Sequence, residues 1–403
     1  MFKSQVIVCV VNFLIAALMG LALRFTFLEN IGINYRFLTH AHSHTAMLGW
    51  ACLMLFTLVA HYFLPHKKVI YNRLFWVTEL AVIGMILSFP FQGYAVVSIF
   101  FSTLHIFCSY YFAYLVFKHH KTNSKAIAYL LKVSLLFMLL STLGVWCLGP
   151  AVGLLGQASA FYQISIQFFL HFQFNGWFLI GVITVLFHLL KIEYSALFCN
   201  FLKLLVVSTI LNFAFTLNSL VPYKILLYIN VIAVFLQVIS LFMFVKLVKT
   251  KLMLLLKNQS KLVIYLYAFS LFCFVLKTLL QTLSILPEVS KMVYNQHNFI
   301  IGFIHLMMLG IISGFLFIFI INEKLIQHTK SLYFGVYSFV IGFVLTEIIL
   351  IIQACKFYFA SGFIPNYYLI LFVFSILLPL GVFFILFNII KTNYHEIKTS
   401  KTT

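Results

Sequence analysis

Long apolar runs separated by short polar connections recur along the whole chain. A helix needs roughly 20 apolar residues to cross a bilayer, because hydrocarbon cannot satisfy exposed backbone groups. This rule predicts about twelve membrane-spanning helices. Their expected ranges are 5–24, 41–64, 74–92, 95–117, 126–148, 161–190, 196–220, 223–246, 262–284, 297–321, 332–354 and 366–390. The pattern therefore predicts an all-α fold, a polytopic transmembrane bundle in which residues 1–403 form a single integral membrane domain.

The composition agrees with this class of protein. Hydrophobic residues make up 64% of the 403 residues and charged residues 8%, whereas soluble domains have roughly 45–50% apolar and about 25% charged residues. The mean hydropathy is +1.11. The lipid bilayer is therefore the first expected partner, and we predict a multi-pass protein of the cell's inner (plasma) membrane.

Basic residues greatly outnumber acidic ones: 26 Lys and Arg against 7 acidic residues give a formal charge of +19. In a soluble protein this excess would indicate nucleic acid. Here 20 basic residues lie at the two termini and the even-numbered connections, five at the odd-numbered ones, and Lys277 inside the ninth helix. Cytoplasmic connections carry the excess of Lys and Arg. We therefore predict that both termini are cytoplasmic and that nucleic acid is not a partner.

Histidines gather in the outer half of the predicted helices. Six of them are His40, His42 and His44 on the second helix, His171 on the sixth, and His297 and His305 on the tenth. His105, on the fourth helix, is interpreted as an interhelical hydrogen-bonding residue. Ionisable groups inside membrane helices are functional candidates, and neutral imidazole ligates haem iron and copper. The histidines therefore predict a metal or haem site.

Haem agrees better with this pattern than zinc or copper alone. A zinc or copper site needs several nearby ligands and often includes cysteine or carboxylate, and none accompanies these histidines in sequence. Haem needs one or two axial histidines and apolar walls, and the chain has 49 Phe and 21 Tyr. No CxxCH motif for covalent attachment occurs. We predict non-covalent b-type haem, with copper a weaker candidate.

The candidate ligands fall into two pairs. His44 and His297 are the leading axial pair, while His171 and His305 lie deeper, at similar depth, where they could face each other across a ligand or metal space. Any of these four could be a metal ligand, and His40 and His42 would orient the ligand or meet the propionates.

Several charged residues could serve the cofactor. Arg36, one turn before the triplet, is a candidate propionate partner, because arginine pairs with carboxylates bidentately; an interfacial anchor is the alternative. Lys277 would contact a propionate, belong to a proton path or extend to the interface. Glu79 and Glu347 are the intramembrane acids, and Glu347 is the better proton-relay candidate.

Twelve helices with outer histidines on the second, sixth and tenth resemble subunit I of the heme-copper oxidase superfamily, which includes cytochrome oxidases and nitric oxide reductases. The segments HAHSHTAMLGW, LHFQFNGWF and QHNFIIGFIHLMMLG occupy these three helices. The resemblance implies that a second-helix histidine and a tenth-helix histidine clamp a low-spin haem, and that a neighbouring tenth-helix histidine holds a high-spin haem.

The sequence also departs from that superfamily. The sixth helix lacks the His-Pro-Glu-Val-Tyr motif, and the seventh lacks the adjacent histidine pair that ligates copper. His297 and His305 replace the tenth-helix His-x-His and lie about 80° apart around a helix. The chain is similar as well to the NnrS family of haem-containing membrane proteins. His42, His44 and Gly49 reproduce its His-x-His and following glycine, and His297 matches its later His-x4-Gly.

The combined expectation is a haem-binding membrane protein that performs redox or gas-ligand chemistry with O2 or NO, without a complete copper site. If it is an enzyme, it is an oxidoreductase, and its partners include an electron donor or accessory membrane subunits. One alternative is a non-enzymatic protein that handles haem or copper or responds to NO. Another is a transporter with a histidine-lined site, although paired Gly/Pro interruptions of helices are not evident.

Overall fold

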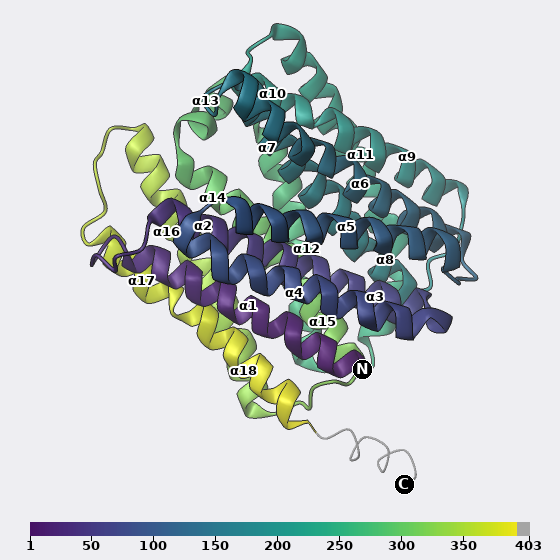
Figure 1. Ribbon diagram of the computed structural model, residues 1–403. Coiled ribbons are helices and arrows are strands. Elements are labelled where there is room, and N and C mark those ends of the chain that lie inside the picture. The colour runs from purple at the N-terminus through teal and green to yellow at the C-terminus, as the bar shows by residue number, and fades with distance from the viewer. Residues whose placement is uncertain (393–403) are drawn as a thin grey trace. The chain divides into compact units, whose positions relative to one another are not determined.

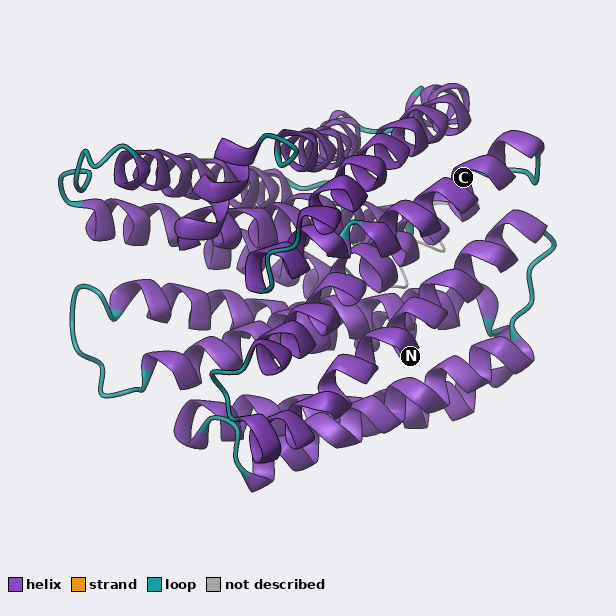
Figure 2. Ribbon diagram, turned by 90° about the horizontal axis from the view of Figure 1, so that it is seen from above, coloured by secondary structure: helices purple, strands orange, loops and turns teal. Residues whose placement is uncertain are grey.

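The computed structural model describes residues 1–392, and these residues form helices joined by short loops, without a strand (Figure 1, Figure 2). The α-helices are α1 (Phe2–Phe25), α2 (Tyr35–His44), α3 (Leu53–Phe63), α4 (Lys68–Gln92), α5 (Val96–His119), α6 (Lys125–Leu155), α7 (Ala160–His171), α8 (Leu179–Leu189), α9 (Ala196–Leu211), α10 (Phe213–Leu220), α11 (Lys224–Leu256), α12 (Lys261–Leu283), α13 (Pro287–Asn295), α14 (His297–His305), α15 (Gly314–Asn322), α16 (Lys330–Tyr358), α17 (Tyr367–Ser375) and α18 (Leu377–Lys391). Three π-helical segments are η1 (Thr45–Cys52), η3 (Phe172–Phe178) and η4 (Leu306–Ser313), and a single 3-10 turn is η2 (Pro65–Lys67).

Twelve continuous helical segments of the described chain are long and apolar enough to cross a membrane, which confirms the predicted all-α polytopic bundle. These spans are Phe2–Phe25, Tyr35–Phe63, Pro65–Gln92, Val96–His119, Lys125–Leu155, Ala160–Leu189, Ala196–Leu220, Lys224–Leu256, Lys261–Leu283, His297–Asn322, Lys330–Tyr358 and Tyr367–Lys391. The second, sixth and tenth spans are the most enclosed, because 83% of the residues in the apolar stretch of each are buried. These same three spans carry the predicted haem-ligating histidines.

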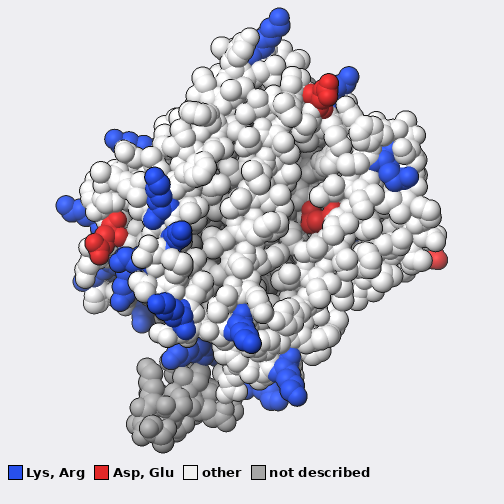
Figure 3. All heavy atoms as spheres, turned by 180° about the vertical axis from the view of Figure 1, so that it is seen from behind, with Lys and Arg blue, Asp and Glu red and all other residues white. Residues whose placement is uncertain are grey.

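Large apolar side chains cover much of the protein surface. Val96 and Leu154 are each 83% exposed and Phe91 is 80% exposed. Figure 3 shows a face made mostly of uncharged residues, on which Lys and Arg stand singly or in small groups. Soluble monomers rarely expose continuous apolar surface of this kind, so the surface agrees with a multi-pass membrane protein.

The chain divides into two compact units, each described by itself. Unit 1 holds residues 1–116 and the chain from residue 313 onward, and unit 2 holds residues 117–312. In unit 1, α1 packs against η1, α2 and α18, and α16 packs along α18. In unit 2, α9 packs along α11, and α6 packs against α7, η3 and α8. The expected single membrane domain over residues 1–403 stays a prediction.

The π-helical segments follow a histidine in each of the three enclosed spans. His44 precedes η1, His171 precedes η3 and His305 precedes η4, and in each case a glycine stands five residues after the histidine. π-Helical turns are uncommon and are frequent at functional sites. The hydropathy pattern did not indicate these segments, because a π-helical turn changes the backbone hydrogen bonds and leaves the apolar composition of the span unchanged.

The glycine of η1 allows neighbouring helices of unit 1 to approach closely. A Cβ on Gly49 would lie 2.8 Å from Cγ1 of Val82 and 3.1 Å from Cβ of Asn12. The Asn12 amide donates hydrogen bonds to the Gly49 carbonyl (3.2 Å) and to Oε2 of Glu79 (2.8 Å). One buried amide thus links the first, second and third spans.

The glycine of η3 has a similar place in unit 2. A Cβ on Gly176 would lie 2.5 Å from Cβ of Phe137 on α6. In both segments the missing side chain is therefore what admits the neighbouring helix, which explains glycine at these positions in physical terms.

An aromatic cluster fixes η1 in the core of unit 1. Trp50 stacks on Phe13 with ring centroids 4.7 Å apart and planes within 4° of parallel. The indole N–H of Trp50 donates to Oγ of Ser313 at 2.8 Å. A buried indole needs such a partner, and this contact ties the second span to the part of the tenth span that belongs to unit 1.

A short helix outside the spans, α13, was not predicted from the sequence. Pro287 occupies its first turn, where a missing N–H costs nothing. Near its other end, the Tyr294 hydroxyl donates to the carbonyl of Phe215 at 2.7 Å. Burial raises the pKa of Tyr294 to about 12, so this hydroxyl keeps the proton that it donates.

Candidate functional site

The three histidines of the second span lie on α2, directly before η1. The side-chain oxygen of Asn34 caps this helix by accepting hydrogen bonds from the N–H groups of Arg36 (3.0 Å) and Phe37 (3.2 Å). Asparagine is favoured there because its oxygen satisfies N–H groups that lack helical partners. Positions four apart share a helix face. His40 and His44 therefore face one side of α2, and the histidine between them faces another.

Both ring nitrogens of His44 are held by named partners. Its Nδ1 lies 2.9 Å from the carbonyl oxygen of His40, and its Nε2 lies 3.1 Å from the Tyr94 hydroxyl. A carbonyl only accepts, so Nδ1 carries the proton and Nε2 accepts from tyrosine. The ring packs on Phe89 at 4.5 Å. A histidine that binds a metal through Nε2 has this same neutral tautomer and is likewise oriented through its other nitrogen.

The other two histidines of the triplet have different surroundings. The ring of His40 meets Tyr94 edge-on at 4.7 Å, beside that of His44. His42 instead faces α1, where its Nδ1 donates to the carbonyl of Ala16 at 2.8 Å. Gly20 makes room for this ring, because a Cβ there would lie 2.9 Å from Cε1 of His42. His40 thus shares the His44 side, and His42 ties α2 to α1.

The charged residues predicted to serve a haem in unit 1 differ in exposure. Arg36 is exposed, and its side chain makes no hydrogen bond or ion pair with the described residues. Glu79 is 4% exposed and is held by Asn12. Glu347 is half-buried within α16. A propionate contact for Arg36 and a proton-relay role for Glu347 stay predictions.

His105 on α5 is a second imidazole of unit 1 with ligand potential, and unlike the half-buried His44 it is fully buried. It is 2% exposed, and its Nε2 has no hydrogen-bond partner in the described part of the chain. Its Nδ1 lies 3.5 Å from the hydroxyl of Ser109, which is on the same helix. His44 is near enough to act on it electrostatically. Among the described residues Nε2 makes no interhelical hydrogen bond, although the backbone of Leu48 on η1 lies near enough to act on the ring. The interhelical hydrogen bond that the sequence suggested for His105 therefore stays a prediction.

His171 in unit 2 donates a hydrogen bond through Nε2, the nitrogen that accepts one in His44. Its Nε2 lies 2.8 Å from the carbonyl oxygen of Thr209 and must donate to it. The ring meets Phe172 edge-on at 5.0 Å and Phe213 at 5.3 Å. As a metal ligand His171 would therefore have to use Nδ1 or give up its bond to Thr209.

The tenth-span histidines open and close α14. His297 is exposed at the first residue of this helix, and His305 is half-buried at its last. Both belong to unit 2, as does His171, whereas His44 belongs to unit 1. Within residues 1–392 no group of three or more His, Cys, Asp or Glu is arranged to hold a metal ion. The pairs His44–His297 and His171–His305 stay predictions.

Lys277 on α12 lies in the interior of unit 2. Its side chain is 3% exposed, so it does not extend to an interface. It borders a cavity with about 20 Å³ of space for water, enough for one molecule. The polar residues that line this cavity are Asn175, Ser208, Thr209, Asn212, Gln237, Ser240, Lys277 and Thr278.

A chain of side-chain amides runs along the same cavity. The Asn212 amide donates to Oε1 of Gln237, and the Gln237 amide donates to Oε1 of Gln281, both at 2.7 Å. Most buried amides in proteins are hydrogen-bonded, and here these bonds join α11, α12 and the residue between α9 and α10. Gln281, which follows Lys277 on its helix face, thus has a structural role.

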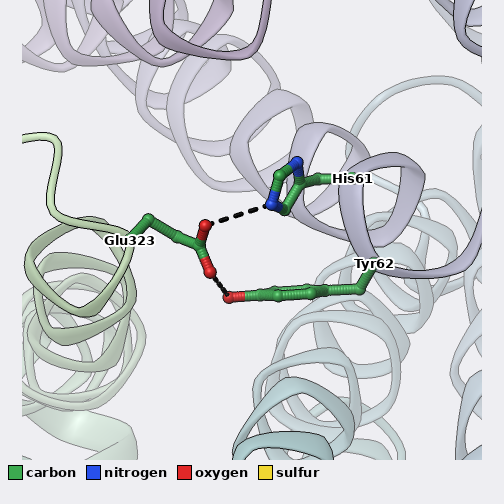
Figure 4. A network of polar contacts seen from close by, with 3 residues as sticks. All are labelled: His61, Tyr62 and Glu323. Carbon is green, nitrogen blue, oxygen red and sulfur yellow. Dashed lines mark hydrogen bonds and ion pairs between the residues drawn. The ribbon is translucent and has the colours of Figure 1, made fainter. Parts of the chain in front are cut away.

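A polar cluster that the sequence did not indicate joins the ends of the second and tenth spans in unit 1 (Figure 4). Glu323 accepts from Nε2 of His61 at 3.1 Å and from the hydroxyl of Tyr62 at 2.5 Å. Phe2 stacks on His61 at 3.9 Å. The side chains of His61 and Glu323 are 30% and 22% exposed. Their positions are 262 residues apart, so no local sequence signal links them.

No family model matches the chain, and no curated protein sequence matches it.

Proposed function

We propose that the protein binds b-type haem non-covalently within the membrane and performs redox or gas-ligand chemistry, and that His44 is an axial ligand. The observation that carries this proposal is the environment of His44. Its Nδ1–H donates to a backbone carbonyl, and its Nε2 faces a tyrosine hydroxyl beside the Phe89 ring. Bound haem with two axial histidines would supply an iron that accepts and passes on electrons, and binding of O2 or NO would require one axial position to open.

The imidazole nitrogens of unit 1 are suitable ligands for haem iron. The buried Nε2 of His105 lacks a partner, and an unsatisfied buried nitrogen costs about 1–3 kcal/mol. A metal ion is one partner that would remove this cost. His105 therefore competes with His297 as the second ligand to iron. Aromatic side chains at Phe89 and Tyr94 supply apolar walls beside His44.

Spectra of single variants test this assignment. Haem-supplied, purified protein with His44→Ala should lose the low-spin spectrum. His42→Ala, on the same helix but bonded to Ala16, is the matched control and should keep it. His105→Ala and His297→Ala are then compared. The variant whose spectrum becomes high-spin has lost the second axial ligand. An unchanged spectrum in His44→Ala would refute the assignment.

The proposed surroundings of the protein follow from charge and composition. We place it in the cell's inner (plasma) membrane with both termini cytoplasmic, because 20 basic residues lie at the termini and even-numbered connections. An electron donor or accessory membrane subunit would supply electrons to the haem. We also propose that the protein is related to the heme-copper oxidase superfamily or to the NnrS family, which its sequence resembles.

A transporter is the second candidate, and one observation favours it. Lys277 is buried beside a polar cavity within unit 2, and intramembrane charges often mark substrate or ion paths. A haemochrome assay separates the two candidates, because a transporter would be purified without stoichiometric haem. A non-enzymatic haem-handling protein would instead contain haem and lack turnover.

A further inference from the structure

Lys277 is a buried amine without a protein counter-charge. It makes no hydrogen bond or ion pair with any described residue, although its side chain is only 3% exposed. The acids of unit 2, Glu193 and Glu288, are both exposed at connections. A buried amine that keeps its proton needs an opposite charge nearby, since neutral dipoles alone compensate an ammonium poorly.

The cavity beside Lys277 offers further hydrogen-bond donors. Thr209 and Ser240 line it, and their hydroxyls form no hydrogen bond with the described residues. Together with Lys277 these residues bring three possible hydrogen-bond donors to the lining of one small space. Such a set suits an anion, as donors do in other anion sites.

The side-chain acceptors on the cavity are amide and hydroxyl oxygens, and none of them carries a charge. Asn175 is 8% exposed, and its Oδ1 has no hydrogen-bond partner in the described chain. Its amide nitrogen donates to the carbonyl of His171 at 3.3 Å, so the unpaired oxygen is left for the cavity. A neutral oxygen can solvate the ammonium, but it cannot balance its charge.

We propose that this cavity is a binding site for one small monovalent anion of about the size of chloride, with the Lys277 ammonium as its counter-charge and the Thr209 and Ser240 hydroxyls as further donors. The space of about 20 Å³ is sufficient for a single small ion or water molecule. The site lies wholly within unit 2. It goes beyond the haem proposal and does not depend on it.

Chloride is the probe for the test. Purified full-length protein in detergent is equilibrated with isotope-labelled chloride, and its thermal unfolding midpoint is measured in chloride and in gluconate at equal ionic strength. We expect saturable binding of one chloride per chain and a higher midpoint in chloride, because a ligand that binds only the folded state stabilises it. Wild-type protein without bound chloride and with equal midpoints would overturn the proposal.

Three variants connect the binding to the cavity. Lys277→Gln should weaken chloride binding at least about tenfold, because a charge-assisted hydrogen bond is lost. Lys261→Gln, an exposed lysine at the start of the same helix, is the matched control and should bind like wild type. Asn175→Asp places a carboxylate at the cavity, so the folded variant should no longer bind chloride or depend on it.

The Asn175→Asp variant keeps the test decisive if Lys277→Gln does not fold. Its built-in negative charge replaces the ion, so a folded protein with a chloride-independent midpoint supports the proposal. Undiminished chloride binding in Asn175→Asp or in Lys277→Gln would place the ion elsewhere and overturn it.

Discussion

At His44 the two ring nitrogens have unequal roles, and the tyrosine beside it gives a test. The Tyr94 hydroxyl lies 3.1 Å from Nε2, the nitrogen proposed to bind iron. If iron takes that position, the hydroxyl is dispensable for haem binding. Tyr94→Phe should therefore retain haem with a low-spin spectrum, whereas His44→Ala should lose that spectrum. Haem content measured by pyridine haemochrome checks both. Equal loss of haem in Tyr94→Phe would show that the hydroxyl itself holds the cofactor.

Gly49 gives a second test at the level of a single residue. An alanine Cβ would lie 2.8 Å from the Val82 side chain, closer than atoms tolerate. Gly49→Ala should therefore reduce the free energy of unfolding by about 1–3 kcal/mol, seen as a lower thermal unfolding midpoint in detergent. Val82→Ala should partly restore it.

Gly153 is the matched control for Gly49. It lies in the helix α6, and a Cβ there would meet no atom within 4 Å. Gly153→Ala should leave stability unchanged or raise it, because alanine loses less backbone entropy in a helix. An equal loss of stability in Gly49→Ala and Gly153→Ala would mean that a general effect of alanine, and not the contact with Val82, lowers the unfolding midpoint.

Part of the site could be predicted from single residues. The spacing of His40 and His44 places both on one helix face, and the structure agrees. The partners could not be predicted, because Tyr94 lies in the turn between the third and fourth spans, far from α2 in sequence. The burial of Lys277 likewise depends on long-range packing, since an isolated helix allows its side chain to extend outward.

The membrane-spanning helices can be predicted from the sequence more directly than the side-chain contacts of the site. All twelve predicted spans occur, because the requirement for about 20 apolar residues is a local property. The π-helical segments and α13 were missed, since neither changes the hydropathy pattern. A glycine five residues after a histidine, repeated in the second, sixth and tenth spans, is the sequence signal that could have indicated the π-helical segments.

The Glu323 cluster joins two elements and predicts a measurable coupling. A double-mutant cycle of Tyr62→Phe and Glu323→Ala should give a coupling of about 0.5–1.5 kcal/mol in thermal or denaturant unfolding. The value is modest because the pair is partly exposed and solvent weakens it. The exposed His66 pairs with neither residue, so a cycle of His66→Ala with Glu323→Ala should give none. Equal couplings in the two cycles would contradict the contact.

For the molecule as a whole, the missing histidines limit the chemistry. The seventh span contains no histidine, and Asn212 after α9 is engaged with Gln237. Two of the three copper ligands that the oxidase likeness implies are therefore absent, which should leave copper affinity too weak for a permanent site. We expect no four-electron reduction of O2.

Oxygen consumption by the purified protein tests this limit. It is measured with a quinol and, separately, with reduced cytochrome c, alongside copper analysis. We expect negligible turnover and no stoichiometric copper. Turnover on the order of 10 per second with one copper per chain would show that the remaining histidines suffice.

The haem content of the purified, full-length protein is the most direct test of the proposed function. The protein is produced with haem supplied, and the pyridine haemochrome is quantified against protein concentration. We expect at least one b-type haem per chain and a Soret band from histidine-ligated iron. Correctly inserted protein with no stoichiometric haem would contradict it.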